Sequence, residues 1–138
     1  MAAHVHIGDW LGVQAPASDS DMLRMVEERL PLSAIKRLET LGFERREIDG
    51  AVIASRTLQH RRSRRERLTV DESDRVLRIA RILSAAEAVY GSRERALLWL
   101  RRPNPRLEGR VPMELAKTEV GGRMVEELLL QVDEGFFV

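Results

Sequence analysis

Apolar residues recur three and four positions apart from residue 21 onward, which is the spacing of an amphipathic helix. Pro31 interrupts the first such segment, and Gly42 closes the second, as a helix-breaking and a helix-capping residue would. A further helix is expected to begin at Ser55, whose hydroxyl suits an N-cap. In the first half of the chain, the pattern predicts short helices over residues 21–30, 33–41, 44–53 and 55–62.

The second half of the chain continues the helical pattern with longer segments. Gly91, the Pro103-Asn104-Pro105 loop and Gly135 mark the expected interruptions. No segment shows the alternation of apolar and polar residues that marks a strand, so we expect an all-α fold. The helices predicted here cover residues 71–90, 93–101, 112–117 and about 119–134.

Composition limits the classes of protein that fit this pattern. The chain has 138 residues and is 43% apolar, which is enough for one compact domain or two small ones. It contains no cysteine, so disulfides and thiolate metal sites are excluded. No apolar run approaches the roughly 18 residues that span a bilayer. We therefore expect a cytoplasmic protein with a flexible arm over 1–20 and domains over 21–67 and 68–138.

Charge is unevenly distributed along the sequence. The formal net charge is only +1, but residues 54–67 carry six arginines and a single acid, Glu66. This segment has a local charge of +5, so the rest of the chain carries about −4. The asymmetry favours an anionic partner for this one segment.

The basic segment also completes a helix-turn-helix pattern, because two short helices are joined by a tight turn and the second is cationic. At such a helix, polar side chains of the first turns read base edges, and nearby cations hold phosphates. A solvated, charged helix end that binds nothing is the alternative. The expected base contacts are Arg56, Thr57, Gln59, His60 and Arg61; the expected phosphate contacts are the Ser55 turn, Arg62, Arg64, Arg65 and Arg67.

Catalytic and metal-binding patterns are weak. His4 and His6 are spaced for a metal, but no cysteine or acidic cluster completes the site, so a solvated pair is the better interpretation. The acidic residues of 71–74 stand at a helix start, where they offset the helix dipole. The sequence contains no phosphate-binding loop, dinucleotide fingerprint or nucleophile motif. We therefore expect a non-enzymatic protein without a cofactor.

The last residues are unusual because two of the three phenylalanines follow the final helix stop. Phe136, Phe137 and Val138 fold back onto the last helix in one interpretation. In the other, they fill a pocket of a partner protein, since aromatic side chains dominate interface energetics. The sequence leaves both interpretations open.

From about Ser33 to its end, the chain resembles the Xre/MbcA/ParS-like antitoxins, which pair with RES-domain toxins. No single motif is specific, but their order and spacing together cover roughly three-quarters of the sequence. The matching stretches are Ser55-Arg56-Thr57-Leu58 with Arg61-Arg62, Leu68 with residues 72–80, Trp99-Leu100 before Pro103-Asn104, residues 107–115, Thr118 with Gly121, and residues 132–135.

The resemblance implies an N-terminal Cro-like helix-turn-helix domain and a C-terminal helical toxin-binding domain. It also implies a homodimer and a partner toxin that consumes NAD, whose active site the antitoxin blocks. With that toxin, the antitoxin would bind operator DNA and repress its own operon. A plain helix-turn-helix regulator with a C-terminal dimerisation domain is the main alternative, and a structural adaptor is a third class.

Overall fold

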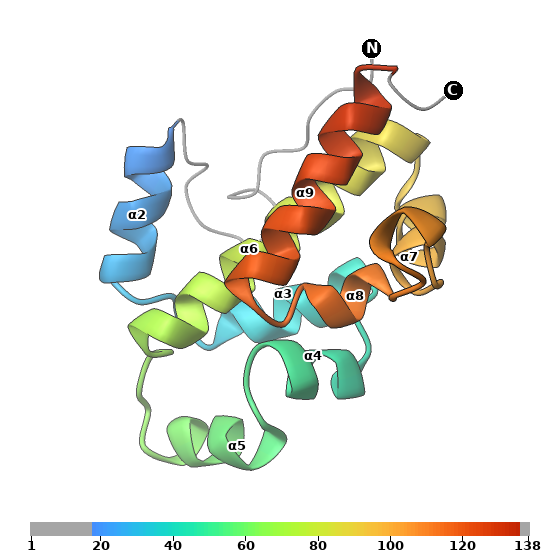
Figure 1. Ribbon diagram of the computed structural model, residues 1–138. Coiled ribbons are helices and arrows are strands. Elements are labelled where there is room, and N and C mark those ends of the chain that lie inside the picture. The colour runs from blue at the N-terminus through green and yellow to red at the C-terminus, as the bar shows by residue number, and fades with distance from the viewer. Residues whose placement is uncertain (1–17, 136–138) are drawn as a thin grey trace. The chain divides into compact units, whose positions relative to one another are not determined.

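The computed structural model describes residues 18–135, and over this range the chain folds into helices without a β-strand (Figure 1). One isolated bridge pairs Asn104 with Arg110. The all-α fold predicted from the sequence is confirmed. The helices are α2 (Asp19–Glu27), α3 (Ser33–Leu41), α4 (Arg45–Ala51), α5 (Ser55–Ser63), α6 (Val70–Tyr90), α7 (Arg93–Leu100), the 3₁₀ helix η1 (Pro105–Leu107), α8 (Pro112–Leu115) and α9 (Glu119–Asp133).

The described chain divides into two compact units, and the division falls between Ala80 and Arg81, inside α6. Residues 68–80, which the sequence analysis groups with the C-terminal domain, pack in the first unit. The Leu68 N–H donates to the Leu30 carbonyl (3.0 Å), and the Leu30 N–H donates to the buried Ser73 hydroxyl (2.9 Å). The functional boundary between the two domains stays a prediction.

Local signals place the short helices of the first unit. Gly42 ends α3 in the left-handed conformation (φ 112°), as its sequence position predicts. A reciprocal capping box between Glu44 and Glu47 begins α4. The buried apolar side chains of this unit include Leu30, Ile35, Leu38, Ile48, Val52, Leu58, Leu68 and Val76.

In the second unit, side-chain hydroxyls cap two helices. Ser92 accepts the Arg95 N–H at the start of α7, and Thr118 accepts the Gly121 N–H at the start of α9. The rings of Tyr90 and Trp99 pack with their centroids 5.5 Å apart. The buried apolar side chains here include Leu83, Leu97, Leu100, Leu107, Met113, Leu115, Val125 and Leu129.

A glycine allows α9 to approach α8 closely. A Cβ atom built on Gly121 would overlap the backbone carbonyl group of Leu115, so no larger residue fits without a shift of the backbone. Among the described residues, no helix is both long and apolar enough to cross a membrane.

Candidate nucleic-acid interface

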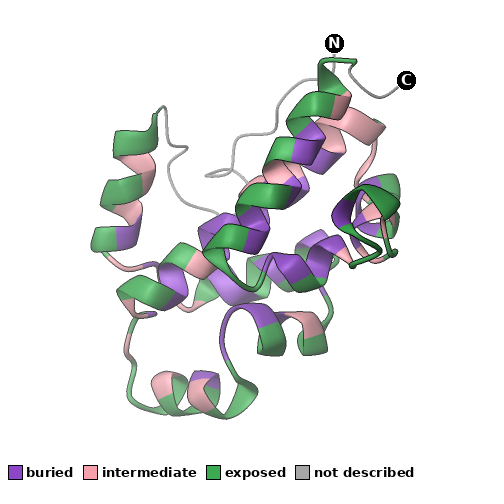
Figure 2. Cartoon of the chain, in the orientation of Figure 1, coloured by how far each residue is buried: buried purple, intermediate pink, exposed green. Residues whose placement is uncertain are grey.

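Helix α5 combines one buried apolar side chain with an exposed polar face. Leu58 is its only buried residue, and the remainder of the helix is exposed or half-buried (Figure 2). The polar face follows the helical spacing, because residues three, four and seven positions apart share one side of a helix. Five predicted or neighbouring polar residues line a surface hollow of about 540 Å³: Arg56, Thr57, Gln59, His60 and Ser63. Four of the five are residues that the sequence predicts to contact bases.

The start of α5 differs from the prediction. Ala54 is the N-cap residue, and Ser55 is the first residue of the helix, so its hydroxyl is not the cap. Instead, the Ser55 N–H donates to Oδ1 of Asp49 (2.7 Å), a carboxylate of the preceding helix. The Ser55 N–H, which the sequence predicts to contact a DNA phosphate, therefore already has a carboxylate as its hydrogen-bond acceptor.

The turn between α4 and α5 is fastened to α6. Nε of Arg75, on α6, donates to the carbonyl oxygen of Val52 at the end of α4 (2.8 Å). Val52 and Ile53, which form this turn, are buried, as their apolar character predicts. The beginning of α5 is thus held by polar contacts from two neighbouring helices.

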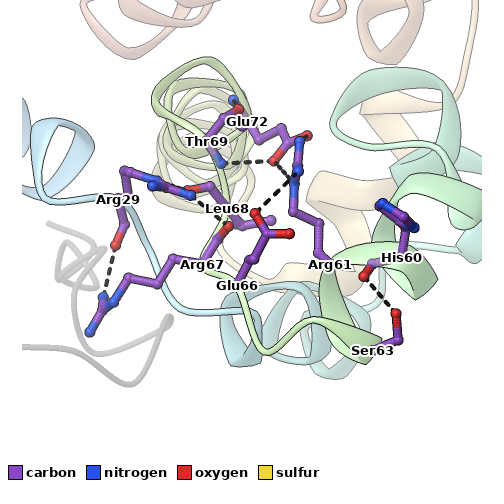
Figure 3. Close-up of polar contacts among 9 residues, drawn as sticks. All are labelled: Arg29, His60, Arg61, Ser63, Glu66, Arg67, Leu68, Thr69 and Glu72. Atoms are coloured by element: carbon purple, nitrogen blue, oxygen red, sulfur yellow. Dashed lines mark hydrogen bonds and ion pairs between the residues drawn. The ribbon is translucent and has the colours of Figure 1, made fainter.

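The end of α5 is held by an ion pair to the first turn of α6 (Figure 3). Nε and Nη2 of Arg61 donate to Oε1 and Oε2 of Glu72, both at 3.2 Å. The Glu66 carboxylate lies 3.9 Å from Nη1 of the same arginine. The side chains of Arg61 and Glu72 are only 20% and 7% exposed, so this pair is largely removed from water.

Glu72 also caps its own helix. Its Oε1 accepts the Thr69 N–H (2.8 Å), and the Thr69 hydroxyl accepts the Glu72 N–H (3.1 Å), which together form a capping box. Burial alone would raise the pKa of Glu72, but hydrogen bonds from Arg61 and Thr69 and the arginine charge lower it below its usual value. The hydrogen bond to Glu72 likewise raises the pKa of Arg61.

The predicted phosphate contacts fall into two groups. Arg62, Arg64 and Arg65 are exposed. Arg67 is exposed too, but its Nη1 donates to the Arg29 carbonyl (2.8 Å). Nε and Nη2 of Arg29 in turn donate to the carbonyls of Leu68 (2.7 Å) and Arg67 (3.1 Å), so this arginine fastens the α5–α6 connection to the end of α2 (Figure 3).

A second candidate surface lies on α9, where the sequence analysis singled out no site. Val125, Leu128 and Leu129 are buried, whereas Val120, Met124 and Leu130 are 58%, 39% and 58% exposed. Helical periodicity identifies apolar positions but does not say which of them a neighbouring element covers.

The predicted toxin contacts Phe136, Phe137 and Val138 lie outside the described residues, as do His4 and His6. Within residues 18–135, no group of three or more potential ligands could hold a metal ion.

Comparison with known proteins assigns each part of this structure to a family. Residues 21–81 match the antitoxin Xre-like helix-turn-helix domain, and residues 85–135 match the antitoxin Xre/MbcA/ParS C-terminal toxin-binding domain. The chain belongs to the Xre/MbcA/ParS antitoxin family. The predicted order of an N-terminal helix-turn-helix domain and a C-terminal toxin-binding domain is thereby confirmed.

Individual members of this antitoxin family show how far the similarity extends. The chain is 47% identical over 62% of its length to an antitoxin Xre of Pseudomonas putida, and 35% identical over 62% to one of Yersinia enterocolitica. These matches span 54% and 58% of the two relatives, so the chain covers little more than half of each. A protein of Sphingobium named Prs ADP-ribosylating antitoxin is 25% identical over 88% of the chain and 83% of its own length.

Proposed function

We propose that this protein is the antitoxin of a RES-domain toxin that consumes NAD, and that it binds operator DNA to control its own operon. The observation that carries the proposal is the tandem order of an Xre-like helix-turn-helix domain and a toxin-binding domain in one chain. A toxin that uses NAD is compatible with the Sphingobium relative, whose name includes ADP-ribosylation, because NAD is the ADP-ribose donor. The protein itself acts by binding and needs no cofactor.

The DNA-binding part of the proposal rests on the exposed face of α5. Arg56 suits the two acceptors of guanine in the major groove, and Gln59 suits the adenine edge. Thr57 and His60 lie in the same hollow and add further base or phosphate contacts. The exposed Arg62, Arg64 and Arg65 supply contacts to phosphates, which strengthen binding to any sequence.

The toxin-binding part rests on the second unit. Val120, Met124 and Leu130 expose apolar surface on α9, within the range that matches the toxin-binding domain. Helix α9 leads directly to Phe136, Phe137 and Val138, which we propose enter the toxin and block its active site. Apolar and aromatic side chains at such a surface would supply most of the binding energy.

We further propose that the protein acts as a homodimer in the cytoplasm. A two-fold dimer presents two copies of α5, so its operator would be pseudo-palindromic. Its half-sites would be separated by about one helical turn, roughly 34–36 Å. A footprint over a single asymmetric half-site would contradict this geometry.

The decisive experiment uses the product of the neighbouring gene. The two proteins should co-purify, and the antitoxin should stop the NAD depletion that the partner causes when it is produced alone. Deletion of residues 136–138 should relieve this inhibition while binding to the upstream DNA remains. If the full chain neither captures the neighbouring product nor protects NAD, the antitoxin function is wrong, and binding to upstream DNA alone would favour a plain regulator.

A further inference from the structure

We propose that Arg61 and Glu72 are positioning residues, which set the orientation of α5 on DNA without touching DNA themselves. This inference rests on the proposed DNA binding and explains how α5, the helix that would contact DNA, is held in place. It also changes the role of one predicted contact, because Arg61 is among the cations expected to meet DNA. In the structure its guanidinium binds Glu72 through two hydrogen bonds.

The position of Arg61 on its helix supports this role. Arg61 is three residues after Leu58, so both side chains lie on the side of α5 that faces the protein. Arg61 is not among the residues that line the surface hollow. The side chain of Arg61 is also only 20% exposed, whereas its neighbour Arg62 is exposed to solvent.

Glu72 can act as a fixed support because its own position is determined independently. Its side chain is buried, and its carboxylate accepts the Thr69 N–H in the capping box of α6. This carboxylate is held by Arg61 and by the Thr69 N–H. If it turned away, a buried charge would lose its partner, and an unpaired buried charge costs much free energy. The end of α5 is therefore tied to the capped start of α6.

The other end of α5 is tied to the same helix one turn further along. Arg75 of α6 donates to the Val52 carbonyl in the turn that precedes α5. Two side chains in the first turns of α6 thus hold both ends of α5. Because only Leu58 is buried along α5, apolar packing alone would leave its tilt weakly determined, and these polar contacts determine it.

The charge on Glu72 makes the two possible roles of Arg61 distinguishable by sign. If Arg61 contacts DNA, at a base as the sequence predicts or at a phosphate, then Glu72 competes with DNA for it, and removing the negative charge strengthens DNA binding. If Arg61 positions α5, then removing that charge loosens the helix and weakens binding to the operator. Glu72→Gln is the suitable variant, because the amide oxygen can still accept the Thr69 N–H and preserve the capping box.

The experiment measures binding of the full chain to the DNA upstream of its own gene and to a shuffled fragment of equal length and composition. We compare wild type, Glu72→Gln, Arg61→Met, the double variant and Arg62→Met as the matched control. Glu72→Gln and Arg61→Met should each weaken upstream binding by about ten- to a hundredfold, the cost of one or two misplaced base contacts. The double variant should be no worse than the worse single variant.

Binding to the shuffled fragment separates positioning from a phosphate contact. It should stay within about twofold for Glu72→Gln and Arg61→Met, whereas Arg62→Met should weaken both fragments alike and lower the salt slope by about one. Circular dichroism at the assay temperature confirms that each variant is folded. Stronger upstream binding by Glu72→Gln, or equal losses on both fragments for Arg61→Met, would overturn the inference. If wild type does not prefer the upstream DNA, the proposed DNA-binding function itself fails.

Discussion

Helices α5 and α9 carry the two candidate binding surfaces, and they are held in opposite ways. Helix α5 buries one side chain, Leu58, and is fastened through hydrogen bonds and an ion pair. Helix α9 buries five residues and is fixed by close apolar packing. Their exposed sides differ as well, since α5 presents polar and cationic groups, whereas α9 presents Val120, Met124 and Leu130 among charged residues.

The difference fits the partner that we propose for each helix. A recognition helix must leave most of its surface polar for DNA, so few positions remain for apolar packing, and polar contacts at its ends replace them. A helix that binds protein can expose apolar side chains on one side while a second apolar stripe holds it in place. Substitutions that act on one helix alone test this contrast.

The largest expected effect follows from removing the one buried side chain of α5. Leu58→Ala should destabilise the first unit by about 2–5 kcal/mol, because the cavity cannot be refilled from the polar face. Urea unfolding measured by circular dichroism gives the cost, and Gln59→Ala is the exposed control, expected within about 0.5 kcal/mol. DNA binding should fall more than capture of the toxin. An equal loss of both activities would contradict the separate anchoring of the two helices.

A smaller effect is expected where α9 meets α8. Gly121→Ala should cost about 1–3 kcal/mol, because the added Cβ overlaps the Leu115 backbone and α9 must shift. Val120→Ala, on the exposed side of the same helix, is the control and should be nearly neutral. Thermal unfolding monitored by tryptophan fluorescence in a Trp10→Phe background, where Trp99 is the remaining tryptophan, would report on this unit. A melting temperature unchanged by Gly121→Ala would mean that the close approach does not fix α9.

The ion pair at the end of α5 should make the stability of the first unit sensitive to acid. The folded-state pKa of Glu72 is lowered, so its contribution is complete above the ordinary glutamate pKa of about 4.3 and is lost as pH falls through the folded value. The difference in unfolding free energy between wild type and Glu72→Gln should therefore narrow on acidification. Urea unfolding at pH 7 and at successively lower pH measures it. A difference that is constant with pH would exclude the charge on Glu72 as its source.

The smallest effect on stability is expected at the exposed apolar residues of α9. The double substitution Val120→Ser and Met124→Gln should change the unfolding free energy by no more than about 1 kcal/mol, since neither side chain is buried. Capture of the toxin should nevertheless fall by about tenfold or more if this face meets the toxin. Light scattering of the variant alone shows whether the face instead joins two copies of the chain. Unchanged capture together with loss of the dimer would assign the face to dimerisation.

The sequence predicted most of the helices because apolar spacing, glycines and prolines are local signals. Gly42 and Pro112 stand where the structure ends α3 and begins α8, and the exposed polar face of α5 follows from helical geometry. The partner of Arg61 was not predictable in this way. Glu72 lies eleven residues further along the chain, on another helix. The local charge of residues 54–67 does not show which arginine is paired within the protein and which is free to meet DNA.

The cap of α5 shows the same limit on a shorter scale. Ser55 has the right chemistry for an N-cap, but the N-cap position falls one residue earlier, at Ala54. The Ser55 N–H instead donates to Asp49 of the preceding helix. The exposure of Val120 and Leu130 also depends on which elements cover α9. The helical periodicity of the sequence does not show this. Predictions based on local sequence therefore succeed for elements and fail for contacts between them.

The contacts that hold α5 have a consequence for how antitoxins of this kind diverge. They run through Asp49, Leu58, Arg61, Glu72 and Arg75, and none of them uses the residues that line the outward hollow. If α5 reads DNA as proposed, mutations at Arg56, Thr57, Gln59 and His60 would therefore alter the recognised sequence at little cost to folding. Duplicated copies within one genome can in this way acquire separate operators while keeping the same scaffold, which would insulate their regulatory circuits from one another.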